Sequence, residues 1–266
     1  MQLAVSSWSL RSHINNEPSW TGRPVGARDF PVYEFPRYVK ETFGVDAVEV
    51  CEIHIPRPDA ARLDQLKESL QSSDVRVVNV PIDVGDISQP DATKREHDLK
   101  LIEFWLDVAA YLGSPAARVN SGSGNLESAI ESYQRLARYG EQVGVRLVLE
   151  NHGGLSADLG NIQRMLESVP SNFGTSPDFG NFPEEKRYDG LALMVPRAAV
   201  VHAKTYDFNA AGEFHNFDFA RCLSIVRDSG FDGYLSVEFE GKGDQPQGVR
   251  QTIDLIRRLE PSVQAA

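Results

Sequence analysis

Cysteine is scarce in this sequence. Among its 266 residues there are only two cysteines, Cys51 and Cys222, and they lie far apart without a Cys-x-x-Cys pair. A disulfide framework requires several cysteines at short spacings. The sequence therefore predicts a protein without structural disulfides, which fits a reducing cytoplasm.

Long apolar runs are missing as well. No run approaches the ~18 apolar residues that a membrane-spanning helix needs. The opening residues, MQLAVSSWSL, contain neither a basic segment nor a long apolar segment, so they do not resemble a signal peptide. We expect no membrane contact and a cytoplasmic location.

An excess of positive charge is also absent, since the formal net charge is -11. Duplex binding depends on Lys and Arg that neutralise phosphates, so the negative net charge argues against a nucleic-acid partner. The net charge does not exclude a local basic groove. The length fits two average domains or one α/β barrel. Only residues 15–28 resemble a linker, so we expect one domain over residues 1–266.

Eight short runs rich in Val, Ile and Leu predict β-strands. They occupy residues 3–8, 47–55, 75–82, 116–121, 146–151, 173–178, 199–206 and 233–240. Several lack strict apolar–polar alternation, which is typical of strands covered on both faces. The sixth run, FGTSPD, has one large apolar residue and is the weakest of the set.

Helical patterns separate these runs. The clearest covers residues 94–113, where apolar residues recur at helical spacing and Gly113 follows as a C-terminal cap. Other patterns cover residues 127–144, 218–230 and 248–260. Repeated strand–helix alternation predicts an α/β protein, a single (β/α)8 TIM barrel.

One connection is unusually long. Residues 9–32 follow the first strand and precede the first helix, and they are rich in turn formers. In a barrel this loop lies over the C-terminal face. It contains His13, Trp20 and Arg23. It is either a surface excursion or an active-site lid with substrate contacts.

Four polar residues stand one per unit in the second half: Glu150, Asp178, His202 and Glu238. Their gaps of 28, 24 and 36 residues match one strand–helix unit of such a barrel. Each lies in or at the end of a predicted strand, so the four should meet at the catalytic end. Taken singly, each is more often a solvated, salt-bridged or hydrogen-bonded residue. Together they predict a metal site.

Three carboxylates and one imidazole suit a hard or borderline divalent cation. We expect one Mn²⁺ or Mg²⁺ ion, with Co²⁺ or Zn²⁺ as further options. Zinc is less favoured because the set has no thiolate and only one histidine. Glu240 lies two residues after Glu238 and shares its strand face, so it is a rival ligand.

The segments LVLENHGG, SPDFGNF, VHAKTYDF and GYLSVEFEG resemble the sugar phosphate isomerase/epimerase family of xylose isomerase-like barrels. That group includes ketose 3-epimerases and inosose dehydratases. The resemblance implies that Glu150, Asp178, His202 and Glu238 bind one divalent metal. It also places Glu49 in the barrel interior as a partner of the ligands. Endonuclease IV, a relative, has a histidine-rich trinuclear zinc site, whereas this chain has six histidines in all.

A divalent cation that chelates a carbonyl and an adjacent hydroxyl acidifies the neighbouring C–H and stabilises an enediolate. Two carboxylates can then act as base and acid. The resemblance assigns these roles to Glu150 and Glu238. Proton return at the same carbon gives epimerisation, return at the next carbon gives isomerisation, and loss of a β-hydroxyl gives dehydration.

Substrate contacts are predicted around the metal. The candidates are His152, Lys204, His54, Asn120, Trp8 and His13. The alternative for His152 is a helix-capping role, for Lys204 a salt bridge to Glu238 or Glu240, and for Trp8 core packing. On the second strand, alternation places Glu52 and His54 on one face.

The leading hypothesis is a metal-dependent sugar or polyol isomerase/epimerase. A dehydratase of the inosose or dehydroshikimate type is the second, and a non-catalytic sugar- and metal-binding barrel subunit is the third. The sequence is compatible with a homo-oligomer. Free sugars are favoured over phosphorylated ones because no glycine-rich phosphate cradle precedes a helix.

Overall fold

The computed structural model describes residues 1–14, 29–55 and 58–260. In these ranges eight β-strands alternate with eight α-helices. The strands are β1 (Gln2–Ser6), β2 (Ala47–Glu49), β3 (Arg76–Ile82), β4 (Ala116–Val119), β5 (Arg146–Leu149), β6 (Phe173–Thr175), β7 (Val200–Thr205) and β8 (Tyr234–Phe239). The helices are α1 (Phe35–Phe43), α2 (Ala60–Ser72), α3 (Ala92–Tyr111), α4 (Leu126–Val143), α5 (Leu159–Ser168), α6 (Glu184–Met194), α7 (Phe219–Asp228) and α8 (Gln245–Leu259).

The strands form one closed parallel sheet. Their order is β6-β5-β4-β3-β2-β1-β8-β7, and every paired neighbour is parallel. Between β6 and β7, parallel bridges join Thr175 to Ala198 and Asp178 to His202. The predicted (β/α)8 barrel is therefore confirmed.

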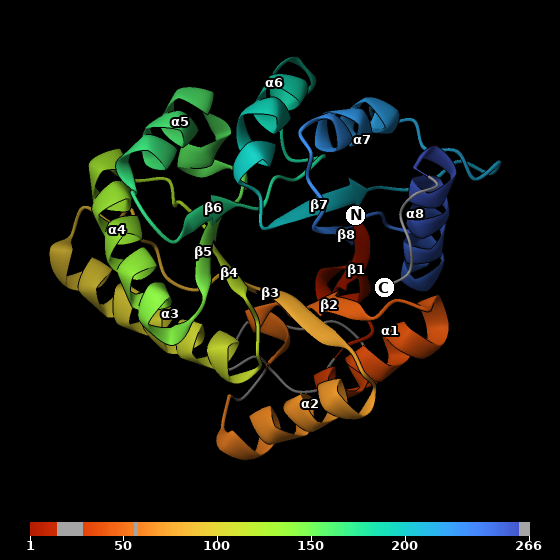
Figure 1. Cartoon of the computed structure of the whole chain (residues 1–266), viewed down its shortest axis with the longest axis horizontal. Coiled ribbons are helices and arrows are strands. Elements are labelled where there is room, and N and C mark those ends of the chain that lie inside the picture. The colour runs from red at the N-terminus through yellow and green to blue at the C-terminus, as the bar shows by residue number, and fades with distance from the viewer. Residues whose placement is uncertain (15–28, 56–57, 261–266) are drawn as a thin grey trace.

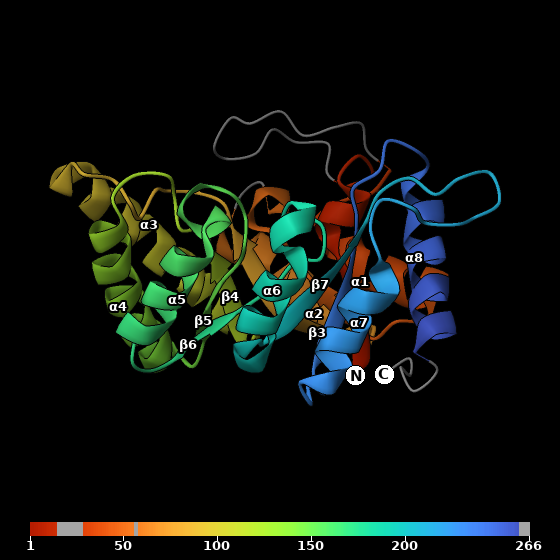
Figure 2. The same cartoon turned by 90° about the horizontal axis from the view of Figure 1, so that it is seen from above.

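The helices surround the strands when the molecule is viewed as in Figure 1, and Figure 2 shows them standing side by side along the barrel wall. Six of the eight follow an Asp or Asn whose side chain accepts a first-turn N–H, namely Asp59, Asp91, Asn125, Asp158, Asp218 and Asp244. Such caps satisfy unpaired helix N–H groups and contribute about 1 kcal/mol each. No helix in the described ranges is both long and apolar enough to cross a membrane.

The barrel interior changes from apolar to polar along its axis. At the N-terminal ends of the strands a buried cluster contains Ala4, Ala47, Val78 and Val200. Two residues further along three of these strands stand Ser6, Glu49 and His202, which are also buried. Barrel interiors are usually filled by bulky branched residues. The polar layer therefore points to a site at the C-terminal end.

All eight strands are shorter than predicted, and the second falls furthest short. The run expected to continue to Ile55 is a strand only as far as Glu49, and Glu52–His54 form a 3-10 turn. The hydroxyl of Ser7 accepts the N–H of Cys51 at 2.9 Å, in place of a bond from a neighbouring strand. The expected strand alternation of Glu52 and His54 is therefore wrong. The first strand likewise ends at Ser6, before a 3-10 turn.

The long loop predicted over residues 9–32 falls largely on residues 15–28, which lie outside the described ranges. At its described ends, the N–H of Phe30 donates to the carbonyl oxygen of His13 at 3.1 Å, and Val32–Glu34 form a 3-10 turn before α1. Trp20 and Arg23 are outside the described residues. The lid interpretation stays a prediction.

Candidate metal centre

Glu150, Asp178 and His202 meet at the C-terminal end of the barrel. Glu150 directly follows β5, Asp178 lies just beyond β6, and His202 lies within β7. Because these strands are parallel neighbours, their carboxyl ends converge. The three buried side chains each offer a ligand atom, and these atoms all lie within 4.8 Å of one another. The strand spacing therefore predicted the meeting of these three side chains.

Three carboxylates lie close to Nδ1 of the His202 imidazole. Its Nδ1 lies 3.1 Å from Glu150 Oε1, 3.6 Å from Glu238 Oε2 and 3.9 Å from Asp178 Oδ2. The three predicted carboxylates therefore all lie within 3.9 Å of His202 Nδ1, with Glu238 outside the group of three whose ligand atoms are mutually close. Burial alone would lower the pKa of His202, but the charges of Glu49 and Glu150 raise it well above its ordinary value. A cation that binds Nδ1 would have to displace this proton.

The other nitrogen of His202 contacts Glu49. The distance from His202 Nε2 to Glu49 Oε2 is 3.1 Å, and Glu49 comes from β2, which is not a neighbour of β7 in the sheet. A carboxylate in this position holds the proton of a neutral imidazole on Nε2 and leaves the Nδ1 lone pair free for a metal. The buried position of Glu49 agrees with the interior place that the resemblance implies.

One oxygen of Asp178 is committed to the backbone and the other is not. Oδ1 accepts the N–H groups of Gly180 and Asn181 at 2.7 and 2.9 Å. Oδ2 is buried and accepts no hydrogen bond from the described residues. Burial raises the pKa of Asp178 to about 7, and the charges of Glu238 and Glu150 add to this against the effect of Lys204. A bound cation would satisfy Oδ2.

Two asparagines that the sequence reasoning missed hold this arrangement. Asn151 donates to the carbonyl oxygen of Asp178 at 3.0 Å and accepts the Asp178 N–H at 2.8 Å. Asn181 donates to Glu150 Oε1 at 3.1 Å and accepts from Lys204 Nζ at 2.8 Å. Asn151 lies in the ENH segment next to Glu150, and Asn181 lies in the SPDFGNF segment three residues after Asp178. This closeness in sequence to predicted ligands could have identified both asparagines as site residues.

Lys204 forms the salt bridge that was the alternative to its predicted substrate contact. Its Nζ lies 3.0 Å from Glu238 Oε1, 3.0 Å from Glu240 Oε2 and 3.4 Å from Asp178 Oδ2. Glu240 also accepts the indole N–H of Trp8 at 3.0 Å. Glu238 and Glu240 thus share one ammonium group, but Glu238 is the one that approaches His202.

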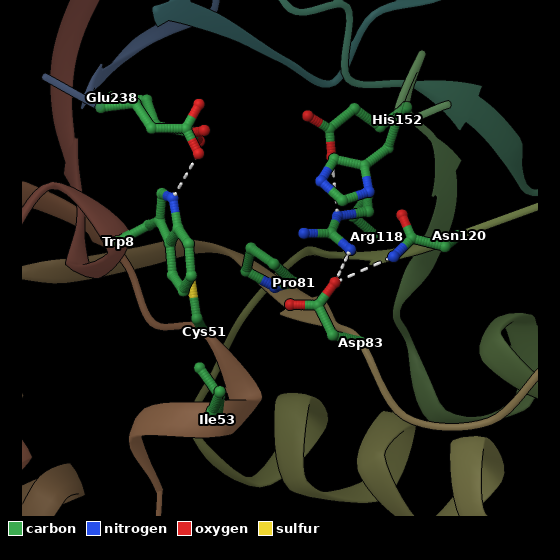
Figure 3. A pocket seen from close by; sticks show the side chains of 11 residues that line it. Trp8, Cys51, Ile53, Pro81, Asp83, Arg118, Asn120, His152 and Glu238 are labelled. Atoms are coloured by element: carbon green, nitrogen blue, oxygen red, sulfur yellow. Dashed lines mark hydrogen bonds and ion pairs between the residues drawn. The ribbon is translucent and has the colours of Figure 1, made fainter. Parts of the chain in front are cut away.

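A cavity of about 330 Å³ opens beside these groups. Its described lining consists of Trp8, Cys51, Ile53, Pro81, Asp83, Arg118, Asn120, Glu150, His152, Glu238 and Glu240. Figure 3 shows Trp8 and Glu238 on one side and Arg118, Asn120 and His152 on the other. Three of the predicted substrate contacts, Trp8, Asn120 and His152, therefore face the cavity.

The other predicted contacts do not line the described cavity. His54 is buried and its Nδ1 lies 2.8 Å from the hydroxyl of Ser7. His13 pairs with Asp29 near the edge of the described segment. Lys204 is buried among carboxylates. Roles for these three in substrate binding stay predictions.

Arg118 is a site residue to which the sequence reasoning gave no role. Its Nε lies 2.9 Å from Glu150 Oε2, and its guanidinium also pairs with Asp83. Asp83 Oδ1 accepts from Asn120 Nδ2 at 2.9 Å. Burial alone would raise the pKa of Glu150, but the charges of Arg118 and His202 hold it well below its ordinary value.

The charge balance of the described site fits a cation. The carboxylates that surround His202 and the cavity are Glu49, Asp83, Glu150, Asp178, Glu238 and Glu240. Among the described residues they form ion pairs with two permanently charged groups, Arg118 and Lys204, and the charge of Arg11 also acts on Glu240 and Glu238. Buried carboxylates need compensation. The oxygen-rich donor set is of the kind that binds hard divalent ions.

The chain belongs to the family of xylose isomerase-like TIM barrels, whose model matches residues 36–259. A comparison with curated protein sequences gave no significant match.

Solved structures share the fold at low sequence identity. An L-ribulose 3-epimerase is 14% identical with a TM-score of 0.77, and the match covers 98% of this chain and 95% of the other. A 3-keto-D-glucoside 4-epimerase from E. coli is 17% identical with a TM-score of 0.71, over 97% and 100% of the two chains. A xylose isomerase-like TIM barrel protein from Mycobacterium smegmatis, solved in complex with magnesium, is 14% identical with a TM-score of 0.71, over 99% and 98%.

Proposed function

We propose that this protein is a divalent-metal-dependent epimerase or isomerase that acts on an uncharged sugar or polyol. The observation that carries the proposal is the convergence of Glu150, Asp178 and Glu238 on His202 Nδ1, at 3.1 to 3.9 Å, next to a cavity. Structural neighbours that are sugar epimerases support the same class. We assign Glu150, Asp178, His202 and Glu238 as the ligands and favour Mn²⁺ or Mg²⁺.

The two glutamates are proposed to move the proton. A divalent cation held by the four ligands would polarise a carbonyl and an adjacent hydroxyl, which acidifies the C–H bond beside them. Glu150 and Glu238 both line the cavity and come from strands that are separated by β6 and β7. One carboxylate removes the proton and the other delivers one to the opposite face. Return at the same carbon gives an epimer.

The remaining lining residues are proposed to orient the sugar. His152 and Asn120 offer hydrogen-bonding groups to hydroxyls on one side of the cavity, and the Trp8 ring forms a wall on the other. The cavity volume of about 330 Å³ lies at the small end of ligand pockets, which suits a single sugar ring.

The test is product analysis with metal-stripped protein. Free ketohexoses and an inosose are incubated in D₂O with Mn²⁺, Mg²⁺, Co²⁺ or EDTA, and products are followed by NMR. We expect epimers with deuterium at one carbon, only when metal is present, and none from Glu238→Gln. Loss of water to an enone or dione would instead support the dehydratase. Full turnover in EDTA, or by Glu150→Gln, contradicts the proposal.

A further inference from the structure

Lys204 is a buried cation that occupies the same ring of carboxylates as the proposed metal. Its side chain is 2% exposed, and its contacts are Glu238, Glu240, Asp178 and the side-chain oxygen of Asn181. An ammonium group is strongly hydrated, so it stays buried only where carboxylates and hydrogen bonds replace its water. Two of its three carboxylate partners belong to the proposed ligand set.

The overlap between Lys204 and the proposed metal extends to a single oxygen. Asp178 Oδ2, the oxygen that accepts no hydrogen bond from the described residues, is 3.4 Å from Lys204 Nζ and 3.9 Å from His202 Nδ1. A cation bound at His202 and Asp178 therefore sits within a few ångströms of a fixed positive charge. The two repel each other and draw on the same negative charges.

Arg118 differs from Lys204 in this respect. It contacts Glu150 through Oε2, while Glu150 Oε1 is the oxygen that faces His202 Nδ1. Arg118 therefore contacts the other oxygen of the carboxylate, and the oxygen that faces His202 has the neutral amide of Asn181 as its hydrogen-bond donor. Lys204 has no such separation at Asp178.

Two groups outside the proposed ligand set keep Lys204 in place. Glu240 Oε2 and Asn181 Oδ1 lie 3.0 and 2.8 Å from its Nζ, and Glu240 is itself held by the indole of Trp8. The ammonium therefore has partners left when a metal takes Asp178 and Glu238. It has a place in both states and does not need to leave the site.

We propose that Lys204 is a built-in counter-cation of the metal centre. It neutralises Asp178 and Glu238 in the metal-free protein and thereby weakens divalent metal binding and stabilises the metal-free fold. It acts through its charge and is not a metal ligand. The inference rests on the metal site proposed above, since a competing charge has an effect only where a metal binds.

The test is metal affinity measured directly, without substrate. Metal-stripped wild-type protein and Lys204→Met are titrated with Mn²⁺ by calorimetry, and both are unfolded thermally with EDTA and with Mn²⁺. We expect Lys204→Met to bind Mn²⁺ at least about tenfold more tightly, because a repelling charge is gone. We also expect a lower Tm in EDTA and a larger gain in Tm on adding Mn²⁺.

Matched variants distinguish the effect of the Lys204 charge from a loss of folded structure. Lys100→Met removes an exposed lysine that pairs with Glu96 on α3, and it should leave the Mn²⁺ Kd within about twofold. If Lys204→Met folds poorly, it is made in a Glu240→Gln background, which leaves one carboxylate fewer without its cation. Adding Lys204→Met to Glu240→Gln should again tighten binding several-fold.

The outcomes distinguish the two proposals. If wild-type protein binds no Mn²⁺, Mg²⁺ or Co²⁺, the metal site and this inference both fail. If wild-type protein binds metal but loss of Lys204 leaves the Kd unchanged or weakens it, only the inference fails. In that case Lys204 serves to hold the ligands in position.

Discussion

The two halves of the barrel mouth carry different chemistry. The half built from β5 to β8 supplies Glu150, Asp178, His202, Lys204 and Glu238, which contact one another at ion-pair distances. The half built from β1 to β4 and the segments that follow them supplies a mixed wall of Trp8, Cys51, Ile53, Pro81, Asp83 and Asn120. One half concentrates charge, and the other shapes the cavity.

The division is not complete, and its exceptions are informative. Glu49 from β2 crosses the barrel to His202, and Arg118 from β4 reaches Glu150. Each of these residues supports a group of the charged half from the other half. The two halves are therefore linked by two buried polar contacts, Glu49–His202 and Arg118–Glu150. Mutations in either half should show how much each contact contributes to metal binding and stability.

The largest effect is expected within the charged half, from Asp178→Asn. The new side chain can still accept from Gly180 and Asn181 through its oxygen, but it turns an NH₂ group toward the metal position. We expect kcat/KM to fall on the order of 1,000-fold, beyond the ~10- to 100-fold typical of residues that only orient ligands. Metal content after dialysis should fall in parallel. Retention of bound metal would contradict the assignment of Asp178.

The next largest effect is expected on stability, from Arg118, which links the two halves of the barrel mouth. Arg118→Met leaves the buried Glu150 and the partly buried Asp83 without their cation, which should lower the free energy of unfolding by about 3–5 kcal/mol in urea titrations. The control is Arg135→Met, which breaks partly exposed pairs with Glu96 and Glu103 and should cost at most ~1 kcal/mol. Equal losses in the two variants would show that Arg118 does not link the halves.

The charged half was the more predictable from sequence. Glu150, His202 and Glu238 lie in or beside apolar runs whose spacing matches barrel units, so their convergence follows from strand geometry. The barrel itself is predictable for the same reason, since repeated strand–helix alternation allows few topologies. Even the weak run before Asp178 contains a strand, Phe173–Thr175.

The remaining features depend on contacts between segments that no local pattern records. Asn151 acts by holding the backbone of Asp178, a partner that only the folded loop brings near. The second strand stops early because Ser7, from the first segment, takes the N–H of Cys51. A salt bridge from Lys204 to Glu238 or Glu240 was one of the predicted alternatives, but only the folded chain shows that Lys204 contacts both glutamates and Asp178 as well.

A smaller effect should follow from Glu49→Gln, which alters the contact that crosses the barrel. The amide can donate as well as accept, so it no longer holds the His202 proton on Nε2. We expect metal affinity and kcat/KM to fall roughly 10- to 100-fold. Glu103→Gln on the outer surface serves as the control. Unchanged metal affinity would mean that Glu49 is there for barrel packing alone.

The smallest effect belongs to the cavity wall. Trp8→Phe keeps an aromatic ring but removes the indole N–H that donates to Glu240, a carboxylate that is one-third exposed and still paired with Lys204. Water can replace the lost donor, so we expect KM to rise only about threefold with kcat unchanged. Trp8→Ala removes the wall itself and should raise KM about tenfold. Trp105→Phe, in the core, should change thermal stability and leave KM as it was. An unchanged KM in Trp8→Ala would remove this ring from the substrate-facing half, leaving Asp83, Arg118 and Asn120 as the polar groups that shape it.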